Sequence, residues 1–146
     1  MKITNISTLF LLGIIILMLS SCNKQINPLT YTKGQLIFGS GGGFANQVNE
    51  YRLLENKRLL FRKNNDTIFT DLGKQKGKTV KKLLKESEAL FQETSGINEP
   101  GNMYYFVRLQ KDQQTQSAVW GRPNTQVPEK AKELHKELMN LVPATK

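Results

Sequence analysis

The chain has 146 residues and a formal net charge of +9 at pH 7, so it is long enough for one domain with its own core and is expected to meet anionic partners. Its single cysteine excludes a disulfide within the chain, and its single histidine excludes a metal site built from paired histidines.

Residues 1–21 have the pattern of a bacterial lipoprotein signal peptide. Lys2 supplies a positive start, and Leu9–Leu19 is an apolar run of about half the roughly 20 residues that a membrane-spanning helix needs. The tetrapeptide Leu-Ser-Ser-Cys that ends at Cys22 has the lipobox form, in which the cysteine sulfur receives diacylglycerol. We therefore expect lipidation at Cys22, which leaves no thiolate for zinc or catalysis. The alternative is an ordinary secretory signal in which this cysteine stands by chance.

Residues 22–33 predict a flexible tether, because they are polar, contain Pro28 and show no hydrophobic period. A single domain is expected over 34–146. Its first half predicts a short strand at 35–39, and then a hairpin of 48–54 with 59–62 that is joined by a third strand at 67–72.

The second half predicts a helix at 79–94, a turn at 98–101, a hairpin of 103–109 with 115–120, and a helix at 128–142. The expected fold class is α+β. It has an antiparallel sheet of about five strands in the order β-β-β-α-β-β-α, with two helices packed on one face.

Six lysines and no acidic residue lie between Gly73 and Lys85, where a predicted strand leads into a helix. An envelope protein meets phosphorylated head groups, anionic glycans and acidic proteins in place of nucleic acid. The alternative is a lysine-rich surface that keeps a small domain soluble. The lysines of this run that we take as candidate contacts are Lys74, Lys76, Lys78 and Lys81.

A glycine-rich stretch, Ser40-Gly41-Gly42-Gly43, follows the first predicted strand. Glycine tolerates positive φ and close approach of other groups, so at least one of the three glycines is expected to have positive φ. One interpretation is a β-bulge or sharp turn, and the other is a nest of N–H groups that binds a carboxylate or phosphate. The four residues are candidate contacts on the second interpretation.

Tyr105, Trp120 and Arg122 are further candidates, since exposed aromatic and arginine side chains are typical of binding surfaces. Core packing is the alternative. His135 is expected at the surface or edge of the last helix, and neither it nor the scattered acids form a recognisable catalytic or metal site.

Several stretches resemble a family of small lipoproteins of Bacteroidota-type bacteria: FGSGGGF at 38–44, EYRLLEN at 50–56, GNMYYF at 101–106 and VWG at 119–121. The likeness covers about residues 34–142. It implies a shared domain and an envelope address, and it implies no activity.

The sequence thus predicts a non-enzymatic binding module, anchored to the membrane by lipid, that recognises an envelope protein or an anionic envelope polymer. An outer-membrane location facing the periplasm is expected, because Asn23, Lys24 and Gln25 lack the acidic run typical of surface export. No metal, cofactor or nucleic acid is expected. The alternatives are a structural component of an outer-membrane assembly complex and an envelope-polymer hydrolase.

Overall fold

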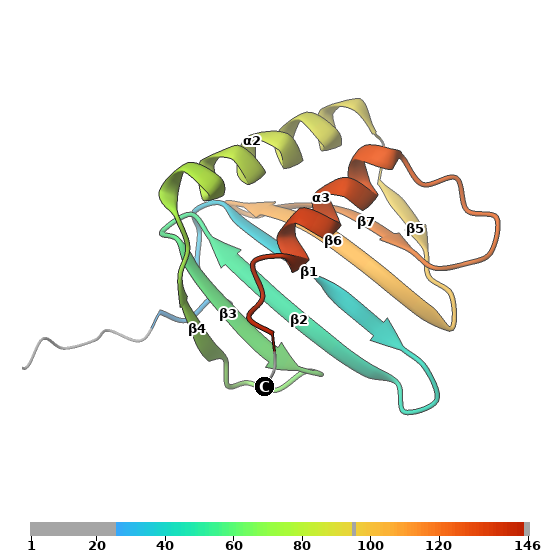
Figure 1. Ribbon diagram of the computed structural model, residues 1–146, viewed down its shortest axis with the longest axis horizontal. Helices are drawn as coiled ribbons and strands as arrows, with labels where there is room; N and C mark the ends of the chain where they lie inside the picture. The colour runs from blue at the N-terminus through green and yellow to red at the C-terminus, as the bar shows by residue number, and fades with distance from the viewer. Residues whose placement is uncertain (1–25, 95, 145–146) are drawn as a thin grey trace, which may run out of the picture.

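The computed structural model describes residues 26–94 and 96–144; the expected signal peptide and Cys22 lie outside this part of the chain. The described residues form two layers, a twisted β-sheet and a pair of helices, α2 and α3, that lie across one face of it (Figure 1). The expected α+β class is confirmed.

The sheet has seven strands in the spatial order β4-β3-β2-β1-β6-β7-β5. Neighbouring strands are antiparallel except β5 and β7, which are parallel. The strands are β1 (Gln35–Gly42), β2 (Gln47–Leu54), β3 (Arg58–Lys63), β4 (Thr70–Lys74), β5 (Ile97–Glu99), β6 (Met103–Lys111) and β7 (Gln114–Trp120).

The prediction of about five strands, all antiparallel, was wrong. Strand β5 has three residues, too few to show an alternating pattern, and turn-forming residues follow it directly. It is a strand because it pairs with β7, over Ile97 with Ala118 to Glu99 with Trp120. Such pairing between distant segments leaves no local signal in the sequence.

Helices α2 (Gly77–Glu93) and α3 (Glu129–Met139) each bury one stripe against the sheet. The buried residues of α3 are Ala131, Leu134 and Leu138, at the spacing of one helix face. Lys82 of α2 pairs with Glu137 at 2.6 Å, and Glu93 pairs with Lys130 at 2.6 Å. These pairs join the start of each helix to the end of the other, so the two helices run antiparallel.

The main core lies between the helices and the sheet. Leu36 and Phe38 of β1, Leu53 of β2 and Val107 of β6 contribute side chains that are fully buried. The opposite face of the sheet, which we call the far face, carries a smaller cluster of Ile37, Phe106 and Val119. Strand alternation produces both faces, because successive side chains point to opposite sides.

Part of the expected tether is packed on the far face. Pro28 is buried, and its carbonyl oxygen accepts hydrogen bonds from Gln35 Nε2 at 3.1 Å and Arg52 Nη1 at 3.2 Å. The hydroxyl of Tyr31 accepts a bond from the backbone N–H of Asn56 at 3.2 Å. Residues 28–33 are therefore not a free tether; the polar sequence hides their role because their bonds are made mainly by backbone atoms.

Candidate ligand-binding surfaces

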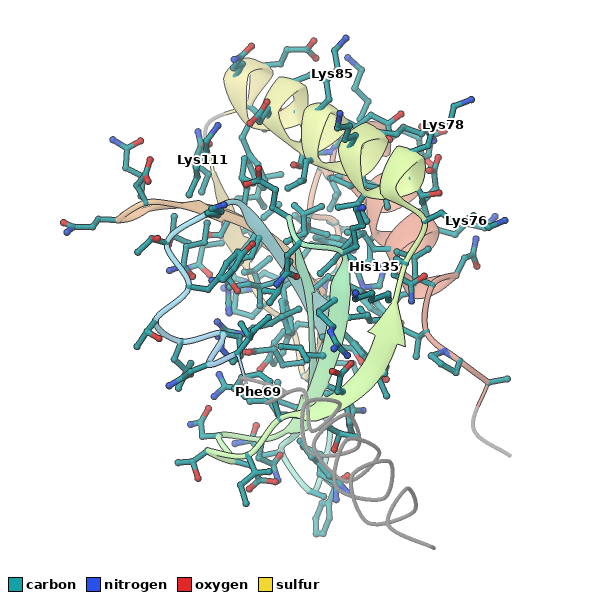
Figure 2. All side chains as sticks on the ribbon, turned by 90° about the vertical axis from the view of Figure 1, so that its left-hand side faces the viewer. Phe69, Lys76, Lys78, Lys85, Lys111 and His135 are labelled. Carbon is teal, nitrogen blue, oxygen red and sulfur yellow. The ribbon has the colours of Figure 1, made fainter. Side chains whose placement is uncertain are left out.

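An open groove of about 690 Å³ borders the N-terminal half of α2. Its other walls come from Gly34, from the turn between β2 and β3, and from the end of β6. We call it the lysine groove. Its charged lining residues are Lys57, Lys78, Lys81, Lys85, Lys111, Glu55 and Glu88. Figure 2 shows Lys76, Lys78 and Lys85 along the helix side of the molecule.

Carboxylates neutralise few of these lysines. Lys111 pairs with Glu88 at 3.3 Å, and Lys82, which does not line the groove, pairs with Glu137 and Glu86. Within residues 26–94 and 96–144, no ion pair is formed by the other lysines around the start of α2, namely Lys57, Lys74, Lys76, Lys78, Lys81 and Lys85. Positive charge therefore accumulates at this end of the domain.

The start of α2 adds to this positive potential. Its N-cap residue is Lys76, no side chain caps the helix, and the first turn contains no acid. The first N–H groups of a helix lack intrahelical partners, and the helix dipole places about half a positive charge there. In this helix the lysines add to the positive potential of the dipole. The start of α2 therefore favours the binding of a negatively charged ligand.

The four lysines proposed from the sequence occupy two positions relative to the groove. Lys78 and Lys81 line it, whereas Lys74 ends β4 and Lys76 lies in the connection to α2; all four are exposed. Lys57 was missed because it comes from the β2–β3 turn. The backbone carbonyl of Lys57 accepts a bond from Gln75 N–H at 2.8 Å, which brings the two segments together.

The glycine-rich stretch serves strand packing. Gly42 and Gly43 have positive φ values of 97° and 76°, which confirms the expectation. A Cβ on Gly41 would lie 2.5 Å from the ring of Tyr104, and one on Gly42 would lie 2.0 Å from the carbonyl oxygen of Asn102. The first two glycines are part of β1, which extends beyond the predicted end at Gly39. These contacts explain them without a bound anion.

The rings of Tyr105 and Trp120 pack against His135 on the helix face of the sheet. Ser40 lies opposite Tyr105 in the sheet, and the rings of Tyr105 and Trp120 meet the imidazole edge-on, with centroids 5.4 and 5.5 Å away. His135 Nε2 donates a hydrogen bond of 3.0 Å to the carbonyl oxygen of Gly39, since that oxygen can only accept.

His135, expected at the surface or edge of the last helix, is half-buried between α3 and the sheet (Figure 2). Burial lowers the pKa of His135, and its bond to Gly39 only partly offsets this effect. The Nε2 atom is used by a backbone carbonyl and so is not available as a base toward Ser40. The cluster holds α3 to the sheet through Tyr105 and Trp120.

Arg122 forms its ion pair outside the aromatic cluster. It is exposed and pairs with Glu99 at 2.7 Å, at a polar groove of about 510 Å³ beside β5. Trp120 is only 8% exposed, whereas Tyr105 is 43% exposed. Of the three residues expected from the sequence to form an aromatic and arginine surface, Trp120 is packed, Tyr105 is exposed, and Arg122 is exposed and ion-paired.

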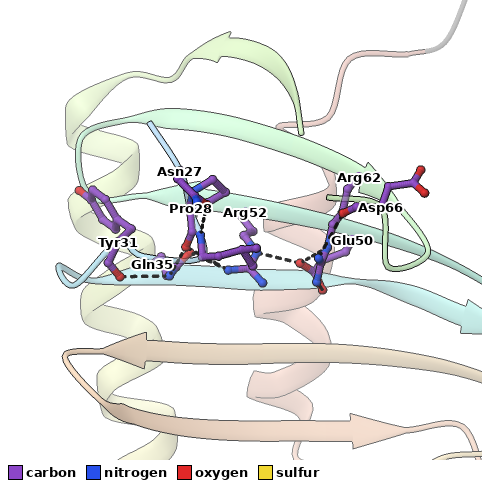
Figure 3. Close-up of polar contacts among 9 residues, drawn as sticks. Asn27, Pro28, Tyr31, Gln35, Glu50, Arg52, Arg62 and Asp66 are labelled. Atoms are coloured by element: carbon purple, nitrogen blue, oxygen red, sulfur yellow. Dashed lines mark hydrogen bonds and ion pairs between the residues drawn. The ribbon is translucent and has the colours of Figure 1, made fainter. Parts of the chain in front are cut away.

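A buried polar network on the far face was not predicted (Figure 3). Glu50 accepts bonds from Arg52 Nε at 2.7 Å, and from Arg62 Nε and Nη2 at 2.9 and 3.0 Å. Burial alone would raise the pKa of Glu50, but the hydrogen bonds and charges of Arg62 and Arg52 outweigh it and lower the pKa. The ring of Phe69 lies over both guanidinium groups. Its centroid is 5.3 Å from the guanidinium carbon of Arg52 and 5.0 Å from that of Arg62.

The alternation of Glu50 and Arg52 in β2 was the available signal for this network. Side chains two residues apart share a strand face, and Glu50 lies opposite Arg62 in the β2–β3 ladder. The predicted hairpin implied their proximity. It did not reveal that Pro28 and Phe69 cover them, because those residues come from segments outside the hairpin.

Within the described ranges, no group of three or more His, Cys, Asp or Glu side chains could hold a metal ion. None of the helices in that part of the chain is long and apolar enough to cross a membrane. Models of known protein families give no match to the chain, and no curated protein matches it.

Proposed function

We propose that this protein is a lipid-anchored binding module of the cell envelope, with Cys22 acylated, and that it binds an anionic envelope polymer in the lysine groove. The observation that supports the polymer most directly is the groove itself, lined by five lysines and two glutamates. An outer-membrane position facing the periplasm, as expected from the residues after Cys22, remains part of this proposal.

A polymer fits the groove better than a small anion does. Lys78, Lys81 and Lys85 follow one another along one side of α2, over a rise of about 10 Å. They form a row of charges, and a chain with repeated negative groups can meet several of them at once. Lysine provides point charges without a fixed hydrogen-bonding fork, so the groove favours charge density over the shape of one ligand.

The binding is expected to be weak per contact and sensitive to salt. A lysine near an anionic surface contributes at most on the order of 1 kcal/mol, and exposed charges are screened beyond about 8 Å at physiological ionic strength. Several lysines acting together are needed for useful affinity. The lipid anchor raises the local concentration of the module at its ligand.

The test is co-sedimentation of residues 23–146 with purified peptidoglycan, at low and at physiological salt. We expect binding that weakens as salt rises, and a large loss in the variant Lys57/Lys78/Lys81/Lys85→Gln. The control variant Lys63/Lys130/Lys132/Lys136→Gln removes the same number of charges from β3 and α3, and it is expected to retain most of the binding.

Equal losses in the two variants would show that only net charge matters, and would contradict a site at the groove. A parallel sedimentation with vesicles that contain phosphatidylglycerol checks the class of ligand. If the groove lysines are needed for the vesicles while peptidoglycan does not bind, the ligand is a lipid head group and the polymer proposal is wrong.

A further inference from the structure

The far face carries exposed apolar side chains next to the start of the described chain. Ile26, Leu29 and Ile68 are 37%, 48% and 76% exposed, and Phe69, which follows Ile68 in sequence, is half-buried. We call these four residues the far-face patch. We propose that the far-face patch rests on the lipid surface to which the protein is anchored. This inference depends on the acylated Cys22 of the proposed function.

The two segments of the patch meet at Arg52. Its Nη1 donates to the carbonyl oxygen of Pro28 at 3.2 Å, and its guanidinium carbon lies 5.3 Å from the centroid of the Phe69 ring. The segment around Pro28 and the segment around Phe69 both contact the Arg52 side chain and thus belong to one surface. Figure 2 shows Phe69 low on the molecule, away from the lysines of α2.

The patch has a defined geometry. Pro28 is buried and is held by Gln35 and Arg52, which places Leu29 and Ile26 at set positions on the far face. An additional bond from Leu29 N–H to Asn27 Oδ1, at 3.0 Å, closes the turn around Pro28. A membrane contact needs such a surface, because side chains on a loose tether would not orient the domain.

The position of the expected anchor identifies the occupant as lipid. Cys22 precedes Ile26 by four residues, and four extended residues span at most about 14 Å. The bilayer surface therefore lies within about this distance of Ile26, the first residue of the patch, whenever the acyl chains are inserted. Exposed apolar side chains next to a bilayer lower their free energy by entering its interfacial region.

The charged network beneath the patch does not oppose this contact. Glu50 is compensated by the two guanidinium groups of Arg52 and Arg62, so the buried network has an excess of positive charge. Phe69 shields both arginines on one side. An anionic head group facing this network would meet no uncompensated carboxylate from it.

The test measures the depth of single added tryptophans in the full, acylated chain on phosphatidylcholine vesicles with brominated acyl chains. Ile68→Trp places the probe in the patch. Gln92→Trp places it at an exposed, uncharged position of α2, in the layer on the other side of the sheet. The native Trp120 is 8% exposed and gives the same background in both variants.

We expect the emission of Ile68→Trp to shift to shorter wavelength and to lose intensity on the brominated vesicles, while that of Gln92→Trp stays unchanged. Loss of intensity in neither variant, or equally in both, would overturn the inference. The mass of the N-terminal peptide separates this failure from that of the proposed function. A chain without acyl groups on Cys22 would overturn both, whereas an acylated chain with unquenched Ile68→Trp would overturn the membrane contact alone.

Discussion

Gly42 is held where both its backbone conformation and its surroundings require glycine. Its φ is 97°, in the region that other L residues rarely adopt, and a Cβ would lie 2.0 Å from the carbonyl oxygen of Asn102. Gly73 has a nearly equal φ of 98°, but a Cβ there would meet nothing within 4 Å. A comparison of Gly42 with Gly73 therefore separates the cost of backbone strain from the cost of steric overlap.

We therefore expect Gly42→Ala to lower the free energy of unfolding by about 2–4 kcal/mol, the sum of strain and overlap. Gly73→Ala is expected to lower it by about 1–2 kcal/mol, from strain alone. Chemical denaturation of both variants measures the difference. Equal losses would mean that β1 and the segment before β6 separate easily, and that the close approach does not determine the need for glycine.

His135 makes the stability of the domain depend on pH. Its pKa in the folded protein is lowered below the ordinary value of 6.5, chiefly by burial. The neutral imidazole is thus favoured by folding, and its contribution to stability is complete above pH 6.5 and is lost as the pH falls through the lowered pKa. The variant His135→Gln removes this titration and keeps a side-chain donor for Gly39.

Denaturation midpoints between pH 8 and pH 5 test this expectation. The parent chain is expected to lose more stability over this range than His135→Gln does, because other titrating groups are common to both. Parallel curves for the two chains would show that the imidazole is as readily protonated in the folded state as in the unfolded state, contrary to its burial against Tyr105 and Trp120.

At the scale of elements, the Glu50 network joins β2, β3 and the segment before β1. Replacing Glu50 by Gln leaves two arginines in the network without a carboxylate, and removing one partner of a buried ion pair typically costs about 3–5 kcal/mol. The variant Asp71→Asn is the control, since it weakens the more exposed pair with Arg58, and exposed pairs contribute about 1 kcal/mol or less.

Thermal and chemical denaturation of the two variants measure this contrast, and proteolysis adds a local readout. We expect Glu50→Gln to increase cleavage near Pro28, because Arg52 would no longer be oriented toward the Pro28 carbonyl. A variant as stable as the parent, with unchanged cleavage, would show that Phe69 and the backbone hydrogen bonds hold the N-terminal segment without the ion pair.

At the scale of the whole molecule, the two proposals assign different roles to the two faces. The far-face patch lies near the expected anchor, and the lysine groove lies by α2 on the helix layer. Both require acylation of Cys22 to bring the domain to an envelope membrane. A single acyl chain gives only marginal attachment, whereas two or more give stable attachment.

Cys22→Ser is expected to leave the precursor uncleaved or to move the protein into the soluble fraction. Fractionation of cells in the presence and absence of detergent, with the mass of the N-terminal peptide, distinguishes these results. A processed variant that still requires detergent would contradict the anchor at Cys22. Ser20→Ala is a suitable control, because a small residue at this lipobox position is retained and normal processing is expected.

The helices and hairpins could be predicted because their signals are local. The buried residues of α2 and α3 repeat at helical spacing, and the two predicted hairpins match β2 with β3 and β6 with β7. Boundaries were less accurate: the α2 helix begins at Gly77 instead of Thr79, and β4 spans Thr70–Lys74 instead of 67–72. Neighbouring strands and hydrogen bonds set these limits.

The sequence by itself determined the α+β class, the lysine density before and within α2, and the need for positive φ among Gly41, Gly42 and Gly43. Periodicity, charge and glycine chemistry act within a few residues and can be recognised there. Only the tertiary structure decided that β5 pairs with β7, that Lys57 joins the groove, and that Pro28 covers Arg52. Each of these depends on contact between segments far apart in the chain, and the free energy of such contacts comes from the surfaces they bury together.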